Sequence, residues 1–286
     1  MRFQLLLFST ADSSLGRVDH ESLPQQALME MVIGEITDKV KICGDIDEPK
    51  DIEEWKRVEI EDGEVTEIDW YQFDIEGSLH SEWLPSSVRK FGATSNRLTG
   101  TLDWASLPIS MESLALRDNL FTGSIGLDRL PERMEHLSFS FNALSGSLKL
   151  DSLPGTLTYF YANNNHFSGS VIFTRLPAVL ARLNLSANQL SGPVALTQLP
   201  GNLKDLNLSN NKFSGSPDLT KLPSSLSFLH LNKNSFSGTV DLSQLPQGLR
   251  RLNLSDNELS GEAFISDAFF DRVKVRDTKI IKRQME

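Results

Sequence analysis

The sequence predicts an α/β fold: a right-handed solenoid with a parallel β-sheet on its concave face, short second strands, irregular convex segments and an N-terminal helical cap. Three observations predict it. Leu-Pro pairs recur at intervals of 23 residues. Within each interval apolar and polar residues alternate, and an Asn and a Gly follow at fixed distances. A unit of this length cannot bury an apolar face alone, so such units stack and share one continuous core.

The repeat is regular over eight units, residues 84–267, without insertion or deletion. The Leu-Pro pairs begin at Leu84, Leu107, Leu130, Leu153, Leu176, Leu199, Leu222 and Leu245. An Asn recurs in register from Asn96 to Asn257, and a Gly preceded by Ser or Thr follows it four residues later in every unit. This regularity indicates one domain that grows by repetition.

A single unit shows what each position does. In residues 228–232, Leu229 and Leu231 alternate with their neighbours, so they are predicted to point inward from a strand. The Asn after the strand can both donate hydrogen bonds to, and accept them from, the backbone of adjacent coils. Gly gives the backbone freedom at the next bend. Residues 239–242 alternate again, which predicts a short second strand, and the Pro fixes an extended turn on the convex side.

The N-terminal end of the array is less regular. Residues 61–83 keep the register as a degenerate first repeat, in which Phe73 replaces the Asn. Residues 1–60 are predicted to form an N-terminal cap, with a helix near residues 25–36 because apolar residues recur there at helical spacing.

The C-terminal end departs from the pattern in the same way. Residues 268–286 are predicted to form a capping strand and a basic tail. The tripeptide Arg276-Asp277-Thr278 falls where x-x-Asn would be expected. A polar cap of this kind shields the open core from water and from other sheet edges.

The unit L-P-x-x-L-x-x-L-x-L-x-x-N-x-[LF]-[ST]-G-x-V-x-L-x-x resembles the leucine-rich repeat (LRR), and its N-x-L-S-G segment is similar to the plant-type subfamily. The resemblance implies a horseshoe-shaped binding module. The helix followed by Trp55-x-x-Val58 and Gly63 is similar to the N-terminal cap of that family, which paired cysteines normally close, whereas here only Cys43 is present. The repeats also resemble those of intracellular LRR proteins of unicellular eukaryotes.

Composition limits the function classes. The net charge of −10 argues against a nucleic-acid partner. Cys43 is the only cysteine, so no intramolecular disulfide or Cys-based metal site can form, which favours a cytoplasmic protein. A secreted or cell-surface recognition protein is the alternative: residues 1–11 imitate a signal peptide, although Gln4 interrupts a short apolar run. Glycosylation sequons begin at Asn184, Asn207 and Asn253. The sequence contains no run of about 18 apolar residues, so no membrane span is predicted.

The charge is unevenly spread along the chain. Residues 44–69 are rich in Asp and Glu, and the last fifteen residues are rich in Lys and Arg. Solvated solenoid ends explain this pattern without a function. A further alternative is that the chain is a structural subunit of a larger assembly, held through its two charged ends.

Binding information is expected at the outward positions of the concave strands, since the inward positions are occupied by the core. Aromatic residues and Arg are the types enriched at interface hot spots. The predicted partner-binding residues are His136, Tyr159, Tyr161, Arg182, Asp205, Phe228, His230 and Arg251. The interpretation is a non-catalytic protein–protein interaction module, a scaffold or adaptor. Sequence drift on an unused surface would give a similar list.

No catalytic, cofactor or metal site is predicted. Asp205, His230 and Ser255 step across neighbouring strands like an acid, a base and a hydroxyl, but with no evident oxyanion hole or substrate pocket. His136 and His230 lie four coils apart, about 19 Å at the usual strand spacing, too far to share a metal ion. The sequence therefore predicts a protein partner and does not identify it.

Overall fold

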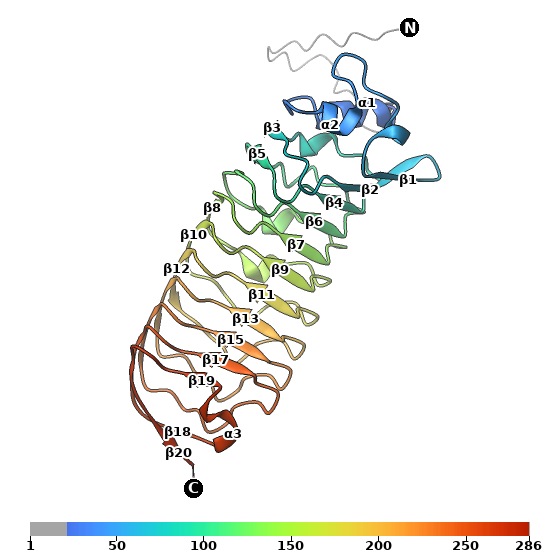
Figure 1. Ribbon diagram of the computed structural model, residues 1–286. Coiled ribbons are helices and arrows are strands. Elements are labelled where there is room, and N and C mark those ends of the chain that lie inside the picture. Colours follow the sequence, from blue (N-terminus) through green and yellow to red (C-terminus); the bar gives the residue numbers. More distant parts are fainter. Residues whose placement is uncertain (1–21, 286) are drawn as a thin grey trace, which may run out of the picture.

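The computed structural model describes residues 22–285 and shows an elongated, curved LRR solenoid (Figure 1). Its concave-face sheet has 11 strands in the order β1-β2-β4-β6-β7-β9-β11-β13-β15-β17-β19. β1 pairs with β2 in antiparallel fashion, and every other pair in this sheet is parallel. The strands are β1 (Val58–Glu61), β2 (Glu64–Asp69), β4 (Lys90–Gly92), β6 (Ser113–Ala115), β7 (His136–Ser138), β9 (Tyr159–Tyr161), β11 (Arg182–Asn184), β13 (Asp205–Asn207), β15 (Phe228–His230), β17 (Arg251–Asn253) and β19 (Val273–Lys274).

A second set of strands runs along the side of the solenoid. Its seven-stranded sheet has the order β20-β18-β16-β14-β12-β10-β8, and β3 and β5 form a separate pair. These strands are β3 (Glu76–Ser78), β5 (Arg97–Thr99), β8 (Ser145–Gly146), β10 (His166–Gly169), β12 (Gln189–Pro193), β14 (Lys212–Gly215), β16 (Ser235–Gly238), β18 (Glu258–Ile265) and β20 (Lys279–Gln284).

The second strand was expected at residues 239–242, and that position is wrong. The strand β16 comes earlier and ends at Gly238. Val240 and Leu242 are nevertheless buried, so the alternation in this segment reflects packing of an irregular segment against the core. Alternation alone therefore located the buried residues and not the strand.

The predicted role of the repeated Asn is confirmed. The Asn165 side chain is 5% exposed; its Oδ1 accepts a hydrogen bond from the Leu144 N–H (3.0 Å), and its Nδ2 donates to the Phe139 carbonyl (2.9 Å). Equivalent bonds recur at the other repeats. Each Asn satisfies buried backbone groups of neighbouring coils at a turn where neither sheet reaches them.

One hydrophobic core runs through the array, from Met29 in the cap to Ile280 in the last coil. The strand leucines are fully buried, and phenylalanines fill the side next to the second sheet, with the rings of Phe213 and Phe236 stacked at 6.3 Å. Short 3₁₀ helices connect to this core at η4 (Leu127–Arg129) and η5 (Leu150–Ser152). Because the inward positions are used up by this core, sequence variation is confined to the outward positions.

The N-terminal cap contains α1 (Gln25–Val32), α2 (Val40–Cys43), η2 (Ile52–Glu54) and η3 (Ser81–Trp83). The first helix is four residues shorter than the predicted 25–36. Its apolar spacing continues past the helix because Ile33 and Ile36 are buried, but Ile36 forms an antiparallel bridge with Gly77 instead of another helical turn. This bridge attaches the cap to the degenerate repeat.

The C-terminal cap contains α3 (Asp267–Phe270), β19 and β20. The sequence placed one irregular strand here, and the structure has two short strands, one in each sheet. Thr278 takes the place of the repeated Asn: its hydroxyl donates to the Val275 carbonyl (2.6 Å) and accepts from the Ile280 N–H (3.2 Å). Within residues 22–285 no helix is long and apolar enough to span a bilayer.

Candidate functional site

The eight predicted partner-binding residues lie on six consecutive strands of the concave sheet, β7 to β17. Neighbouring strands pair in register, for example Arg182 with Asp205 and Asp205 with Phe228, so their outward side chains form continuous rows. At about 4.8 Å per strand, the six strands span about 24 Å. None of these side chains is buried, and Tyr159 is 38% exposed. The structure thus brings all eight onto one accessible surface.

An aromatic group occupies the N-terminal end of this surface, on β7 and β9. The His136 ring meets Tyr159 at 5.9 Å and 82°, and Tyr161 at 6.0 Å and 78°, both edge-to-face arrangements that aromatic rings favour. The Ser113 hydroxyl lies 3.3 Å from His136 Nδ1. Burial lowers the pKa of His136, so its ring is neutral at pH 7. The group presents flat, rigid contact area at little entropic cost.

Phe141 lies on the turn that follows β7, and in the described structure its ring does not contact the rings of His136, Tyr159 or Tyr161. The Arg117 guanidinium lies over its ring at 4.9 Å, a cation–π contact. Phe141 has a φ of +57°, and the residue before the repeated Asn adopts the left-handed conformation in every coil.

Arg182 connects the aromatic group with the C-terminal half of the surface. A hydrogen bond with the Tyr161 side chain is the main cause that raises the pKa of Arg182, with smaller contributions from Asp205 and Tyr159. The sequence had suggested two separate groups, one around the tyrosines and one around Phe228. The structure joins them through this arginine, which a one-dimensional pattern cannot show because the link depends on side-chain direction.

Asp205 and His230 form a half-buried pair beside Phe228. Burial raises the pKa of Asp205 and lowers the pKa of His230, and the attraction between the two opposes both shifts. Ser255, by contrast, is buried, and its N–H donates to Asn253 Oδ1 at 3.2 Å. Within the described chain no hydrogen bond links Asp205, His230 and Ser255, so these three residues do not form a nucleophilic triad.

A hollow on the N-terminal part of the concave face was missed by sequence reasoning. It has a volume of about 390 Å³ and lies over β2, β4 and β6, where Gly92 and Ala115 occupy the outward positions of β4 and β6. Its rim carries the ion pairs Lys90–Glu67 (2.6 Å) and Arg57–Asp69 (3.0 Å). Two small residues in succession at the outward position were the available signal, and the β1 hairpin that closes the hollow has no repeat signature.

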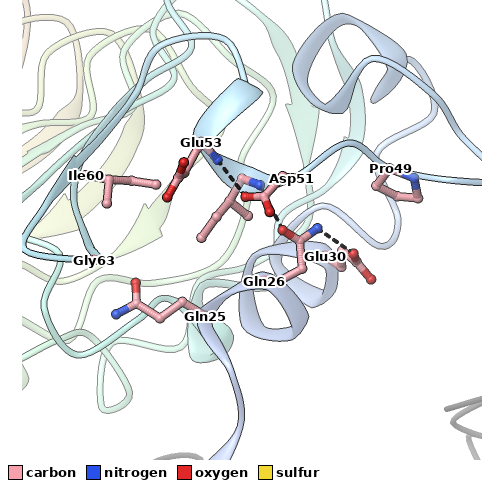
Figure 2. Close-up of a pocket in the computed structure, with 9 residues that line it drawn as sticks. Gln25, Gln26, Glu30, Pro49, Asp51, Glu53, Ile60 and Gly63 are labelled. Atoms are coloured by element: carbon pink, nitrogen blue, oxygen red, sulfur yellow. Dashed lines mark hydrogen bonds between the residues drawn. The ribbon is translucent and has the colours of Figure 1, made fainter. Parts of the chain in front are cut away.

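A polar pocket in the N-terminal cap is structural. It lies between α1 and the β1 hairpin, with the side chains of Gln25, Gln26 and Asp51 directed into it (Figure 2). Gln26 Oε1 accepts from the Ile52 N–H (2.8 Å), and Gln25 Oε1 accepts from the Val65 N–H (2.6 Å). The glutamine oxygens therefore satisfy the cap's own backbone and are not directed to a ligand.

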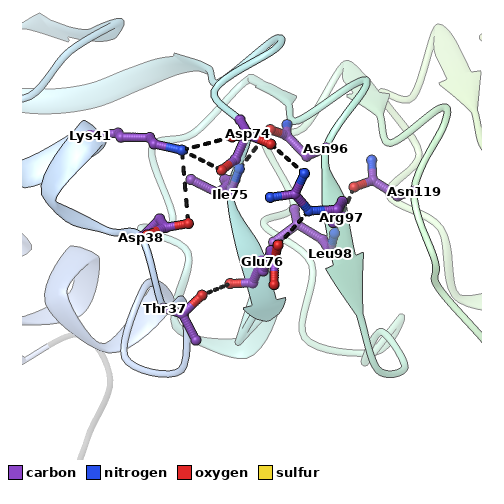
Figure 3. A network of polar contacts seen from close by, with 10 residues as sticks. All are labelled: Thr37, Asp38, Lys41, Asp74, Ile75, Glu76, Asn96, Arg97, Leu98 and Asn119. Atoms are coloured by element: carbon purple, nitrogen blue, oxygen red, sulfur yellow. Dashed lines mark hydrogen bonds and ion pairs between the residues drawn. The ribbon is translucent and has the colours of Figure 1, made fainter.

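A polar network joins the cap to the repeats (Figure 3). Asp74 forms ion pairs with Lys41 of α2 (3.2 Å) and with Arg97 of β5 (2.6 Å). Arg97 also pairs with Glu76. These contacts lower the pKa of Asp74. All four side chains are largely exposed, so the network orients the cap more than it stabilises it.

Among the residues described, no group of three or more His, Cys, Asp or Glu side chains could hold a metal ion. The concave face remains the surface with the most exposed aromatic and cationic side chains in register. Its chemistry is that of contact recognition: edge-to-face rings, a cationic link and a charged rim around a hollow.

The 23-residue repeats and the solenoid fold are similar to those of leucine-rich repeat proteins. The Leucine Rich Repeat family model matches residues 202–222. The fold is similar to those of plant LRR receptor ectodomains. The PEPR1–AtPEP1 crystal structure aligns with a TM-score of 0.69 and 21% identity, covering 91% of this chain and 41% of that chain.

Two further structures extend the comparison. The Arabidopsis receptor kinase HAESA, in complex with the peptide hormone IDA and the co-receptor SERK1, aligns with a TM-score of 0.52 and 22% identity over 90% of this chain and 54% of that chain. A plant ice-binding protein aligns with a TM-score of 0.55 and 18% identity over 84% of this chain and 88% of that chain. This chain spans only about half or less of the two receptor chains. No protein of curated function matches it in sequence.

Proposed function

We propose that this protein is a non-catalytic recognition module that binds a peptide or protein partner on its concave face. The observation that carries the proposal is the continuous surface formed by His136, Tyr159, Tyr161 and Arg182 on three neighbouring strands, in which the His136 ring meets both tyrosine rings and Arg182 interacts with Tyr161. Side chains of these types dominate binding energy at interfaces, and here they are already arranged by one another before a partner arrives.

The fold comparison supports a recognition role over a purely structural one. Receptor ectodomains of similar fold are seen with a peptide hormone and a co-receptor, although a plant ice-binding protein shares the fold as well. At 18–22% identity the likeness concerns the fold, so the proposal rests on the side chains of this chain. A scaffold or adaptor is a narrower version of this role, whereas a structural subunit held through its charged ends is an alternative to it, and both remain predictions.

The test is affinity recovery with matched variants. Wild type, Y161A/R182A and the control R175A/K221A are used as bait in extracts and medium from the source cells. Arg175 and Lys221 are exposed and lie outside both sheets. Partners that wild type and the control recover, and the concave variant loses, support the proposal. Truncation of two interface anchors costs at least about 2 kcal/mol, or about 30-fold in affinity.

Equal recovery of every partner by a Y161A/R182A variant with wild-type circular dichroism would contradict the proposal. The dissociation constant of the recovered partner is then measured by calorimetry for all three proteins. This second measurement separates a direct contact from indirect capture through another protein.

A cytoplasmic location, and with it the likeness to intracellular LRR proteins of unicellular eukaryotes, is part of the proposal. In the sequons, the Oδ1 atoms of Asn184 and Asn207 each accept bonds from the Ser two residues on, and both side chains lie on the concave strands. Glycans there would cover the proposed binding surface, which supports a location without glycosylation. The signal-like residues 1–11 lie outside the described residues.

The mass of the intact native protein tests this location. The mass of the full chain without glycans is expected. A mass that shows cleavage near Ala11 together with occupied sequons would place the protein in the secretory route and favour the receptor-like alternative.

A further inference from the structure

Charge is divided between the two halves of the concave face. The part from β1 to β7, including the residues that flank each strand, carries more carboxylates than cations. The carboxylates are Glu59, Glu61, Asp62, Glu64, Glu67, Asp69, Glu112, Asp118 and Glu135, and the cations are Arg57, Arg89, Lys90 and Arg117.

Most of the cations in this half are already neutralised. Lys90 pairs with Glu67 (2.6 Å), Arg57 with Asp69 (3.0 Å) and Arg89 with Glu61 (2.7 Å). Arg117 lies over the Phe141 ring. Within the described chain Glu59, Glu112 and Glu135 have no ion-pair partner, so the N-terminal half presents uncompensated negative charge.

The C-terminal half, from β11 to β19, has the opposite balance. The cations there are Arg182, Lys204, Lys233, Arg250, Arg251, Arg272, Lys274 and Arg276, and the carboxylates are Asp205, Asp256, Asp271 and Asp277. One ion pair joins these groups, between Arg276 and Asp277 at 3.0 Å, in the described part of this half.

The tyrosines of β9 lie between the two charged halves. On the acidic side of them is the hollow over Gly92 and Ala115, whose lining also includes the charged side chains of Glu67, Asp69 and Lys90. Along the sheet the order is therefore an acidic part that contains the hollow, then the aromatic group, then the basic surface. Ten strands from β2 to β19 make this path about 43 Å long, the length of about 13 residues of extended chain.

We propose that the concave face selects an extended peptide segment with segregated charge. Its cationic part lies over β1 to β7, a large apolar side chain at its centre contacts the tyrosines of β9, and its anionic part lies over β11 to β19. The inference rests on the proposed function and specifies the ligand of the same surface. Complementary charge at both ends fixes the position and direction of the segment and accelerates its association.

Two synthetic 14-residue peptides of equal composition test the inference. One has lysines in one half, a central Phe-Leu pair and aspartates in the other half; the second alternates lysine and aspartate around the same pair. Fluorescence polarisation measures binding at low and high salt. The segregated peptide is expected to bind at least about tenfold more tightly, and to lose that advantage at 1 M salt, where the Debye length is about 3 Å.

Protein variants locate the effect. E112K/E135K reverses two carboxylates beside the concave strands, and E132K/E258K reverses two exposed carboxylates away from them. Both variants change the net charge of the protein equally. The first is expected to weaken binding of the segregated peptide at least tenfold, and the second to change it less than twofold.

Equal affinity of the two peptides, no measurable binding of either, or equal effects of the two variants would overturn the inference. A different result would contradict the proposed function. If the natural partner depends on Tyr161 and Arg182 but not on Glu112 and Glu135, the face binds a partner without this charge order. If no partner depends on the concave residues, both proposals fall.

Discussion

The repeated Asn gives the most direct test of how the solenoid is held together. In the N165A variant the Leu144 N–H loses its single hydrogen-bond partner, because no other acceptor lies within reach in the described structure. The Phe139 carbonyl keeps a bond from Asn142 (3.1 Å), and the Ala162 carbonyl keeps one from Asn188 (3.0 Å). The substitution therefore leaves one buried donor unsatisfied and weakens two shared acceptors.

The magnitude follows from this count. A buried unsatisfied donor costs about 1–3 kcal/mol, and loss of the shared bonds adds about 1 kcal/mol, so the free energy of unfolding is expected to fall by about 2–4 kcal/mol. The control is N202A, since Asn202 is exposed and donates one solvent-accessible bond to the Ala178 carbonyl (3.0 Å). Its effect is expected to stay within about 0.5 kcal/mol.

Urea unfolding followed by far-UV circular dichroism measures both variants. The midpoint gives the stability change, and a decrease in the m-value would show that the array unfolds in parts around the altered coil. A loss below about 0.5 kcal/mol for N165A, or equal losses for N165A and N202A, would refute the role assigned to the Asn ladder.

Three further predictions concern the cap, the thiol and the aromatic group. In G77A the new Cβ would lie 2.0 Å from the Glu35 carbonyl oxygen, at a residue with a φ of +105°. Proteolysis should therefore release the cap far more readily than in the control G63A, where φ is +83° and no atom lies within 4 Å of the new Cβ. Equal protease resistance of the two variants would contradict the bridge between Ile36 and Gly77. Cys43 is buried and burial raises its pKa, so Ellman's reagent at pH 8 should react slowly in native protein and rapidly in urea; fast native reaction would contradict its burial. Burial lowers the pKa of His136, so below about pH 6.5 the unfolded chain binds more protons than the native chain, and the free energy of unfolding decreases as the pH is lowered. The H136F variant should lose less unfolding free energy than wild type between pH 7 and pH 5. An unchanged dependence of stability on pH would refute this assignment.

Much of the fold could be predicted because repetition makes local signals additive. Leu229 and Leu231 report strand direction only weakly as one unit, but the same register in eight units fixes the sheet. The helix near residues 25–36 was predicted too long because Ile36 is buried by a bridge to Gly77, a contact between distant parts of the chain. The second strand was misplaced because the apolar alternation of residues 239–242 reflects burial of an irregular segment, whereas the strand β16 ends at Gly238.

The position of the candidate site could be predicted from the sequence, but the contacts between its side chains could not. The register places Tyr159, Tyr161 and Arg182 on one surface, and that surface follows from the repeat alone. The contact of Arg182 with Tyr161 depends on side-chain conformation. The hollow depends on side chains that are missing, at Gly92 and Ala115, and on a hairpin outside the repeat. A repeat pattern reveals the residues that recur in every unit, whereas the contact of Arg182 with Tyr161 and the hollow each occur once.

Hydroxyl-radical footprinting of the protein with and without its recovered partner tests the central claim most directly. The reporters are Tyr159 and Tyr161 on the concave sheet, and the controls are Ile172 and Phe264, which are 52% and 53% exposed and lie away from it. Partner binding is expected to reduce oxidation of both tyrosines severalfold and leave both controls unchanged. Unchanged tyrosines together with protection of Ile172 or Phe264 would place the partner on another surface and contradict the account.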